Sequence, residues 1–294
     1  MAQSSAIHLT ALLLLAAASS AAAQQSYSGP PYLGFDRNIY PGDAALPALR
    51  RDFRYTGYWL NNPPGESLDT WTGKRALLKQ YSFGFLVLFN GRADADLKGQ
   101  NPATIGASDG NAAVALARRE GFPTNVRIFL DQEEGGRLLP EQAAYLFAWI
   151  DAVRAAGARA GVYCSGIPVP DGHGGTISTA QDIAERLSAQ ALPSSKGRGV
   201  EREPRVLWVA DDRCRPSPGC SLSTPSIAAA FSPAMRPFIA AWQYAESPRR
   251  ARFSAACPAN QAPDGNCYAP GLPPDASSFV DLNVADSPDP SEAP

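Results

Sequence analysis

The sequence predicts an α/β protein built as an irregular (β/α)8 barrel of the TIM type, with few helices after the fifth strand. Three observations lead to this prediction. Short apolar runs recur along the chain, helix patterns lie between several of them, and the last third is rich in Pro, Gly and Ser with little helical periodicity. Runs that are apolar throughout are typical of strands buried on both faces, as in a parallel sheet.

The strand-like runs number eight, and most are short and rich in β-branched or aromatic residues. They cover residues 32–36, 55–60, 84–89, 126–131, 159–164, 205–209, 237–243 and 277–283. Eight strands are what a closed (β/α)8 barrel needs, so we expect the first and the eighth strand to be neighbours.

Helices are predicted between several of these strands. The clearest covers residues 140–157, where Pro140 suits the first helical position and Gly157 suits the stop. Two more are expected over 110–121 and 178–192. No comparable pattern follows the sixth strand, which is why the barrel is expected to be irregular.

The two ends of the chain differ from the middle. Residues 1–23 combine an apolar run with Ala21-Ala22-Ala23, the layout of a cleaved secretory signal, although a positive N-terminal region is missing. A membrane anchor is the alternative, but the run is shorter than the roughly 20 apolar residues of a span. We therefore expect a secreted or periplasmic protein with no membrane span in the mature chain, a barrel over 30–286, and a disordered tail over 287–294.

The cysteines agree with export. Four of the five form two close pairs in Pro- and Gly-rich stretches, which local disulfides would stabilise in an oxidising compartment. These four are Cys214, Cys220, Cys257 and Cys267. Zinc binding is the alternative, but neither pair has zinc-site spacing or a nearby His. Cys164, at the end of an apolar strand, is expected to be a buried thiol.

Composition narrows the function. The net charge is −2, and no basic stripe or phosphate-binding loop is present, so no nucleic-acid partner is predicted. Nothing in the sequence calls for a cofactor or indicates an oligomeric state. Behind the signal, His173 is the only histidine. Cys164 with His173, or a metal held by Asp171 and His173, are less favoured alternatives to a solvated loop, and no metal site is predicted.

Acidic residues fall where strands of the barrel end. Asp36 ends the first strand, Asp131 and Glu133 follow the fourth, and Asp281 lies in the eighth. Side chains alternate along a strand, so Asp131 and Glu133 share a face while Glu134 points the other way. Because the active site of such barrels gathers at the C-terminal strand ends, we expect these four carboxylates to converge.

Converging carboxylates raise one another's pKa, and a protonated acid beside ionised ones is what cleavage of a glycosidic bond requires. The structural alternative is that Asp131 and Glu133 cap the next helix, or pair with Arg37 or Arg137. Glycoside hydrolysis by carboxylates needs no histidine, which fits this chain.

Six stretches together resemble the secreted muramidases of glycoside hydrolase family 25. They are LGFDRNIYPGD, IFLDQEEG, AGVYCSG, VLWVADDR, AAWQYAE and VDLNVAD, and they span about residues 33–286. A related family of secreted glycoside-hydrolase-like domains of unassigned function is similar over the same motifs, and residues 57–92 look more like that family. Asn38 and Pro41 stand where a muramidase usually has Ser and Gln.

The resemblance implies a role for each acid. Glu133 would be the general acid, and Asp131 would assist it as nucleophile, electrostatic stabiliser or orienter of a substrate acetamido group. Asp36 and Asp281 would tune the pKa of Glu133 and position the sugar. The expected sugar contacts are Asn283, Asn90, Gln243 and Tyr40.

The sequence therefore predicts a secreted glycoside hydrolase acting on peptidoglycan or a related polysaccharide. The alternative is a secreted barrel that binds glycan without cleaving it. Neutralisation of the Asp131–Glu133 pair by Arg37 or Arg92 would favour binding, whereas an open groove with a raised carboxyl pKa would favour catalysis.

Overall fold

The computed structural model describes residues 31–190, 205–213, 222, 225–247, 267–269, 271–273 and 278–292. The predicted signal over 1–23 lies outside these residues, as do Cys214, Cys220 and Cys257. Cys267 is buried, and the pairing of the four cysteines stays a prediction. Within the described ranges, no helix is both long and apolar enough to cross a membrane.

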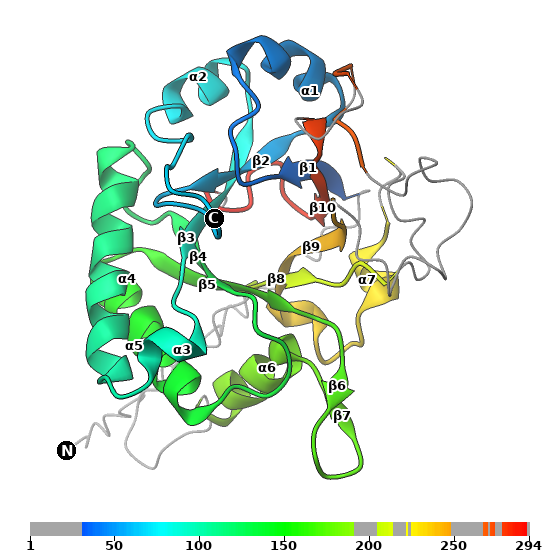
Figure 1. Cartoon of the computed structure of the whole chain (residues 1–294). Helices are drawn as coiled ribbons and strands as arrows, with labels where there is room; N and C mark the ends of the chain where they lie inside the picture. Colours follow the sequence, from blue (N-terminus) through cyan, green and yellow to red (C-terminus); the bar gives the residue numbers. More distant parts are fainter. Residues whose placement is uncertain are drawn as a thin grey trace, which may run out of the picture.

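Eight strands form a closed barrel, which confirms the predicted fold class (Figure 1). Around the barrel the order is β1-β10-β9-β8-β5-β4-β3-β2. The strands are β1 (Tyr32–Asp36), β2 (Tyr55–Trp59), β3 (Gly84–Asn90), β4 (Arg127–Gln132), β5 (Arg159–Ser165), β8 (Leu207–Ala210), β9 (Ile239–Ala245) and β10 (Asp281–Ala285). A small hairpin of β6 (Val169–Pro170) and β7 (Thr176–Ile177) follows β5.

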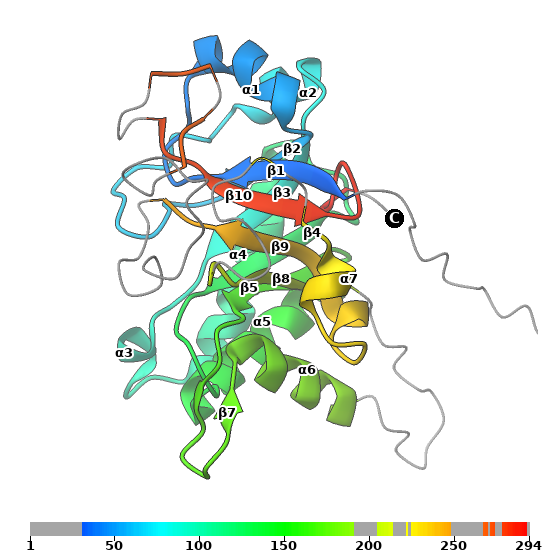
Figure 2. The same cartoon turned by 90° about the vertical axis from the view of Figure 1, so that its right-hand side faces the viewer.

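The last strand departs from the expected pattern. β10 covers 281–285 instead of 277–283, and it pairs antiparallel with both β1 and β9. Figure 2 shows β10 lying between β1 and β9. Because β10 runs in the opposite direction, Asp281 at its beginning lies at the same rim as Asp36 at the end of β1, and the two residues are register partners.

Most of the helix lies before or directly after β5, as predicted. The elements are α1 (Leu46–Asp52), α2 (Arg75–Gln80), α3 (Asp94–Leu97), α4 (Pro102–Arg119), α5 (Pro140–Ala155), α6 (Thr179–Gln190) and α7 (Ile227–Ala230), with short 3-10 turns at Asp43–Ala45 and Arg236–Phe238. α4 begins eight residues before the predicted start at 110. Asn101 caps it by accepting from the Thr104 N–H at 3.1 Å, and Pro102 takes the first helical position.

Close approach of α4 to α5 explains why the start of α4 is hard to read. An added Cβ would lie 2.2 Å from the Tyr145 carbonyl oxygen at Gly106 and 2.8 Å from the Trp149 carbonyl oxygen at Gly110. Glycine is a poor helix former in isolation, and here the contact with α5 outweighs that propensity. The predicted helix, which starts at Gly110, therefore leaves out the first two turns of α4, where Gly106 lies.

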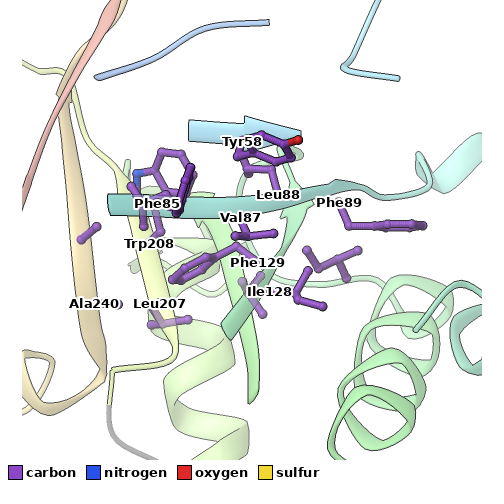
Figure 3. Close-up of a cluster of buried hydrophobic side chains, with 14 of the residues drawn as sticks. Tyr58, Phe85, Val87, Leu88, Phe89, Ile128, Phe129, Leu207, Trp208 and Ala240 are labelled. Carbon is purple, nitrogen blue, oxygen red and sulfur yellow. The ribbon is translucent and has the colours of Figure 1, made fainter. Parts of the chain in front are cut away.

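Aromatic side chains fill the barrel and the layer around it (Figure 3). Phe129 and Trp208 meet edge to face with ring centroids 5.9 Å apart, and Gly161 leaves room, since an added Cβ would be 2.5 Å from the Phe129 ring. Phe85 and Tyr58 also pack edge to face, at 5.7 Å. A barrel interior filled with side chains is a packed core and not a pore, so a ligand is expected at the strand ends.

The tail over 287–294 is expected to be disordered, but its residues 287–292 are ordered, and residues 293 and 294 lie outside the described residues. Ser291 is fully buried; its N–H donates to the Phe85 carbonyl at 2.9 Å, and its carbonyl accepts from the Arg127 N–H at 2.8 Å. The Val87 N–H donates to Ser291 Oγ at 2.9 Å. The expectation was wrong because it weighed only the polar composition, whereas β3 and β4 offer backbone groups that the tail satisfies.

Candidate active site

Asp36 stands at the centre of a buried hydrogen-bond network at the C-terminal rim. Its Oδ1 accepts from Gln243 Nε2 at 3.0 Å and from Asn283 Nδ2 at 2.6 Å. All three side chains are buried. Gly57 on β2 makes room for this arrangement, because an added Cβ there would lie 2.6 Å from the Asp36 Cβ.

The side-chain oxygen of each amide also accepts a hydrogen bond from an aromatic residue. Tyr163 donates its hydroxyl to Gln243 Oε1 at 2.7 Å, and the Trp208 indole Nε1 donates to Asn283 Oδ1 at 2.8 Å. Tyr163 and Trp208 also pack edge to face, with centroids 4.8 Å apart. Each amide thus uses its oxygen and its nitrogen, so Gln243 and Asn283, predicted as sugar contacts, are placed as supports of Asp36.

Asp131 is the most unusual carboxyl of the rim. It is 5% exposed, and neither of its side-chain oxygens has a hydrogen-bond partner among the described residues. Burial, followed by the charges of Glu133 and Asp36, raises its pKa well above the ordinary value. An unpartnered buried carboxyl is costly, which makes Asp131 a candidate for contact with a ligand.

The pKa values of Asp36 and Asp281 are raised by burial as well. Burial raises the pKa of Asp36 to about 6, against the lowering effect of the Asn283 and Gln243 amides, and Glu133 raises it further. The pKa of Asp281 is also raised well above its ordinary value, chiefly by burial and then by Asp36 and Glu246. The acids therefore converge as the sequence predicts, and together they hold protons at a pH where isolated carboxyls would not.

Glu133 is the acid of this group that solvent reaches most freely, since its side chain is exposed. It lines two hollows at the rim. One, of about 290 Å³, is lined by Glu133, Tyr163, Ser165, Ala210 and Glu246. The other, of about 180 Å³, is lined by Pro64, Asn90, Gly91, Arg92, Ala93, Asp131, Gln132, Glu133 and Glu134. Glu133 thus stands where the two hollows meet the acid cluster.

Glu134 has a structural role, in line with the expectation that it points away from its neighbour. Its Oε1 accepts from the Asp94 N–H at 2.8 Å, and its Oε2 accepts from Gln132 at 3.1 Å and also from Gln142. These contacts tie the end of β4 to α3 and α5. Both carboxylate oxygens are engaged, so Glu134 is not a candidate for catalysis.

The basic residues near the rim have acidic partners of their own. Arg92 makes two hydrogen bonds to Asp109, at 2.8 and 3.1 Å, and Arg137 pairs with Asp182 at 2.7 Å. Burial lowers the pKa of Arg37, while the charge of Asp281 acts in the opposite direction. Neither Arg92 nor Arg137 neutralises the Asp131–Glu133 pair, which removes one argument for a purely structural pair.

The two remaining predicted sugar contacts differ in their distance from the acids, since Asn90 is the register partner of Asp131 and Tyr40 has other neighbours. Asn90 lines the smaller hollow, and its Nδ2 donates to the Asn62 carbonyl at 2.8 Å. Tyr40 packs edge to face on Trp71 at 5.2 Å, with Lys74 Nζ 4.9 Å from its ring centroid. Asn90 keeps its place at the site, whereas the contacts of Tyr40 are with the loop before α2.

Sequence reasoning missed two acids at this rim. Glu246 directly follows β9 and raises the pKa of both Tyr163 and Asp281. Asp212, just after β8, is buried and raises the pKa of Asp281. The rule that selected Asp36, an acid at the C-terminal end of a strand, applies equally to these two residues and would have found them.

The alternative chemistries have little support. In the part of the chain that the structure describes, no cluster of three His, Cys, Asp or Glu residues could hold a metal. His173 is exposed in the β6–β7 hairpin, where its N–H donates to Asp171 Oδ1 at 2.8 Å. Cys164 is a buried free thiol whose pKa is raised by burial and by the charge of Asp131. A nucleophilic Cys needs the opposite shift.

Comparisons with known proteins match part of the chain to a described domain. Residues 75–216, just under half of the chain, match the family model described as "Rv2525c-like, glycoside hydrolase-like domain". That segment includes Asp131 and Glu133 and leaves Asp36 and Asp281 outside. A comparison with curated proteins finds no match.

Several solved structures are similar to this chain. An uncharacterized B. stearothermophilus protein matches with a TM-score of 0.54 at 20% identity, over 86% of this chain and 95% of that one. The Mycobacterium tuberculosis Tat-secreted protein Rv2525c, in complex with L-tartrate, matches at 0.50 and 12% identity, over 90% and 99%. A bacterial lysozyme from Streptomyces coelicolor matches at 0.44 and 11% identity, over 87% and 92%.

The barrel and the family model confirm the resemblance that the sequence motifs predict. At identities of 20% or less, the structural matches show similarity of fold and nothing about function. The chain thus carries, over residues 75–216, a match to a glycoside hydrolase-like domain, set in a closed barrel whose rim gathers the predicted acids.

Proposed function

We propose that this chain is a secreted glycoside hydrolase that cleaves glycosidic bonds in peptidoglycan or a related polysaccharide by carboxylate chemistry. One observation carries the proposal. Asp131 is buried with both oxygens unpartnered and a raised pKa, next to the exposed Glu133, at the open end of a filled barrel. Such perturbed carboxyls in a hollow are typical of acid/base catalysis.

Glu133 is the proposed general acid. Solvent reaches its side chain, and it lines both hollows, so it is the acid that can meet a glycosidic oxygen. The proton it delivers goes to the leaving-group oxygen as the C–O bond breaks. Asp131, held close behind it, assists as nucleophile, electrostatic stabiliser of the cationic transition state, or orienter of an acetamido group.

Asp36 and Asp281 are the proposed tuning residues. Charge on Asp36 raises the pKa of both Asp131 and Asp281. Keeping neighbouring carboxyls protonated near neutral pH reduces the repulsion that a second ionised acid would create. The leader-like residues 1–23 support export, and the Tat-secreted description of the M. tuberculosis structure is in line with it.

The test is release of reducing sugar by the chain from residue 24 onward, given purified peptidoglycan and a panel of neutral polysaccharides. We expect Glu133→Gln to lower kcat by at least about 10²-fold, the scale of a lost general acid. Glu141→Gln, an exposed acid in the first turn of α5, is the matched control and is expected to keep full activity.

Two results would separate this proposal from its alternative. Activity that disappears in Glu133→Gln, with circular dichroism unchanged, supports hydrolysis with Glu133 as its acid. No release from any substrate, together with glycan pull-down that is equal for the wild type and Glu133→Gln, would reject hydrolysis and leave a glycan-binding barrel.

A further inference from the structure

Both amide donors of Asp36 converge on the same atom. Gln243 Nε2 and Asn283 Nδ2 each donate to Oδ1, and among the described residues no hydrogen-bond donor reaches Oδ2. A carboxyl with two N–H donors on one oxygen keeps that oxygen as the acceptor. When Asp36 takes up a proton, the proton therefore belongs on Oδ2.

The orientation of each amide is fixed by a hydrogen bond that its oxygen accepts. An amide could rotate by half a turn and present its oxygen to Asp36 instead of its NH2 group. The Tyr163 hydroxyl donates to Gln243 Oε1 at 2.7 Å, and Trp208 Nε1 donates to Asn283 Oδ1 at 2.8 Å. Rotation would break these bonds and set an oxygen against an oxygen at Asp36.

These hydrogen bonds form a relay that runs from each aromatic side chain through an amide to Asp36. We infer that Tyr163 and Trp208 are positioning residues for the acid cluster. By orienting Gln243 and Asn283, they fix which oxygen of Asp36 carries its proton and how readily that proton is released. The hydrogen bonds of both residues go to the amides and not to Asp36, so each residue acts through an amide. This assigns a role to two aromatics that would otherwise count only as core packing.

Several other titratable groups also face Asp36. Asp131 and Glu133 approach from β4 and its end, and Asp281 from β10. Two phenols, Tyr163 on β5 and Tyr55 on β2, also interact with the Asp36 charge. Of these groups, Glu133 is the one whose charge raises the pKa of Asp36, after the larger effect of burial, whereas the two amide donors lower it and so favour the anion.

The relay matters for chemistry because the charge of Asp36 adds to the effect of burial on two neighbouring acids. Its charge raises the pKa of Asp131 and Asp281. A loss of orientation at Gln243 would therefore change the protonation of the whole cluster. That consequence for catalysis rests on the proposed function, whereas the relay itself is testable without any substrate.

Tyr163→Phe is the direct test, because it keeps the ring that packs on Trp208 and removes only the hydroxyl. The readout is the pKa of Asp36, followed by the ¹³C carboxyl chemical shift during a pH titration of the full mature chain. We expect Tyr163→Phe to raise that pKa by roughly one unit, the scale of one hydrogen bond to a charged group. Tyr58→Phe is the matched control, since its hydroxyl contacts Glu120 on the outer side of the barrel, and it should leave the Asp36 pKa unchanged.

A double-mutant comparison tests whether Tyr163 acts through Gln243. Gln243→Leu removes the amide donor and should raise the Asp36 pKa at least as far as Tyr163→Phe does. Adding Tyr163→Phe to Gln243→Leu should then give no further shift, because the hydroxyl has lost the group that it orients. Trp208→Phe and Asn283→Leu form the parallel pair.

An unchanged Asp36 pKa in Tyr163→Phe, or an equal shift with and without Gln243, would overturn the inference. Thermal unfolding of every variant shows whether it is folded; if Tyr163→Phe does not fold, the Trp208 pair decides. Failure of the sugar-release test leaves these titrations interpretable, and failure of the titrations leaves the sugar-release test untouched.

Discussion

Asp36 and Asp281 are directly opposed partners in the antiparallel pairing of β1 with β10. Two carboxyls held in this way cannot both ionise freely, and the pKa of Asp281 is accordingly raised by Asp36 after the larger effect of burial. The pairing places one acid from the first strand and one from the last strand at the same rim, beside the acids of β4.

Removal of the Asp36 charge should therefore change the pKa of the neighbouring carboxyls. In Asp36→Asn we expect the pKa of Asp281 and of Asp131 to fall, because one repulsive charge disappears from each. Carboxyl ¹³C titration measures both. Asp52→Asn, at the exposed end of α1, should change neither value. Unchanged values in Asp36→Asn would mean that the three acids are not electrostatically connected.

Asp131 should make the fold less stable as the pH rises. Its pKa is raised in the folded chain, so between the unfolded and folded pKa the native state holds a proton that the unfolded state releases. The free energy of unfolding then falls as the pH rises through this window. Asp131→Asn cannot ionise, and we expect it to unfold at a higher temperature than the wild type at pH 8, with a smaller difference at pH 4.

Scanning calorimetry across pH 4–8 measures this effect, with Asp151→Asn on the exposed face of α5 as the control. The same change should abolish glycan hydrolysis if the proposed function holds. A wild-type and an Asp131→Asn protein with identical pH dependence of unfolding would show that the carboxyl carries no buried charge.

Gly57 should be essential to the place of Asp36. An added Cβ would lie 2.6 Å from the Asp36 Cβ and 3.3 Å from its Cα, so Gly57→Ala must push β1 or the Asp36 side chain aside. We expect a loss of stability of about 1–3 kcal/mol from overpacking, and an altered Asp36 pKa. Urea denaturation and carboxyl titration measure the two effects. Gly135→Ala, where the added atom would meet only Ser165 Oγ at 4.0 Å, should be far milder.

Ser291 should stabilise the end of the barrel that lies opposite to the rim with the acids. Ser291→Ala leaves the buried Val87 N–H without its acceptor, which costs about 1–3 kcal/mol in the free energy of unfolding. Urea denaturation measures this cost. If the proposed function holds, glycan hydrolysis at low urea should be unaffected because the acids lie at the other rim. Ser67→Ala, in the loop before α2, is the comparison; an equal effect there would contradict a specific role for the tail.

The strands and the acids of this chain could be predicted because their signals are local. The run 126–130 is apolar at every position except Arg127, which suits a strand covered on both faces, and Asp131 follows it immediately. The meeting of Asp36 and Asp131 at one rim then follows from closure of a barrel whose first four strands are parallel. The resemblance of six motifs pointed to the same domain that the family model matches over 75–216.

Other features depend on contacts between segments far apart in the sequence. The antiparallel direction of β10 comes from pairing with β1 and β9, and no periodicity in residues 277–285 encodes it. Asp281 reaches the rim because it begins this reversed strand. The order of the tail depends on backbone groups of β3 and β4, which a polar stretch of sequence does not reveal.

What the sequence by itself determined is therefore which residues form the barrel wall and which acids stand at strand ends, since both depend on neighbouring residues along the chain. Only the tertiary structure decided the roles within the site. Gln243 and Asn283 look like sugar ligands in the sequence, but burial beside Asp36, with Tyr163 and Trp208 behind them, turns them into supports. Burial and hydrogen-bond partners are properties of the packed molecule, and they set the pKa of each acid.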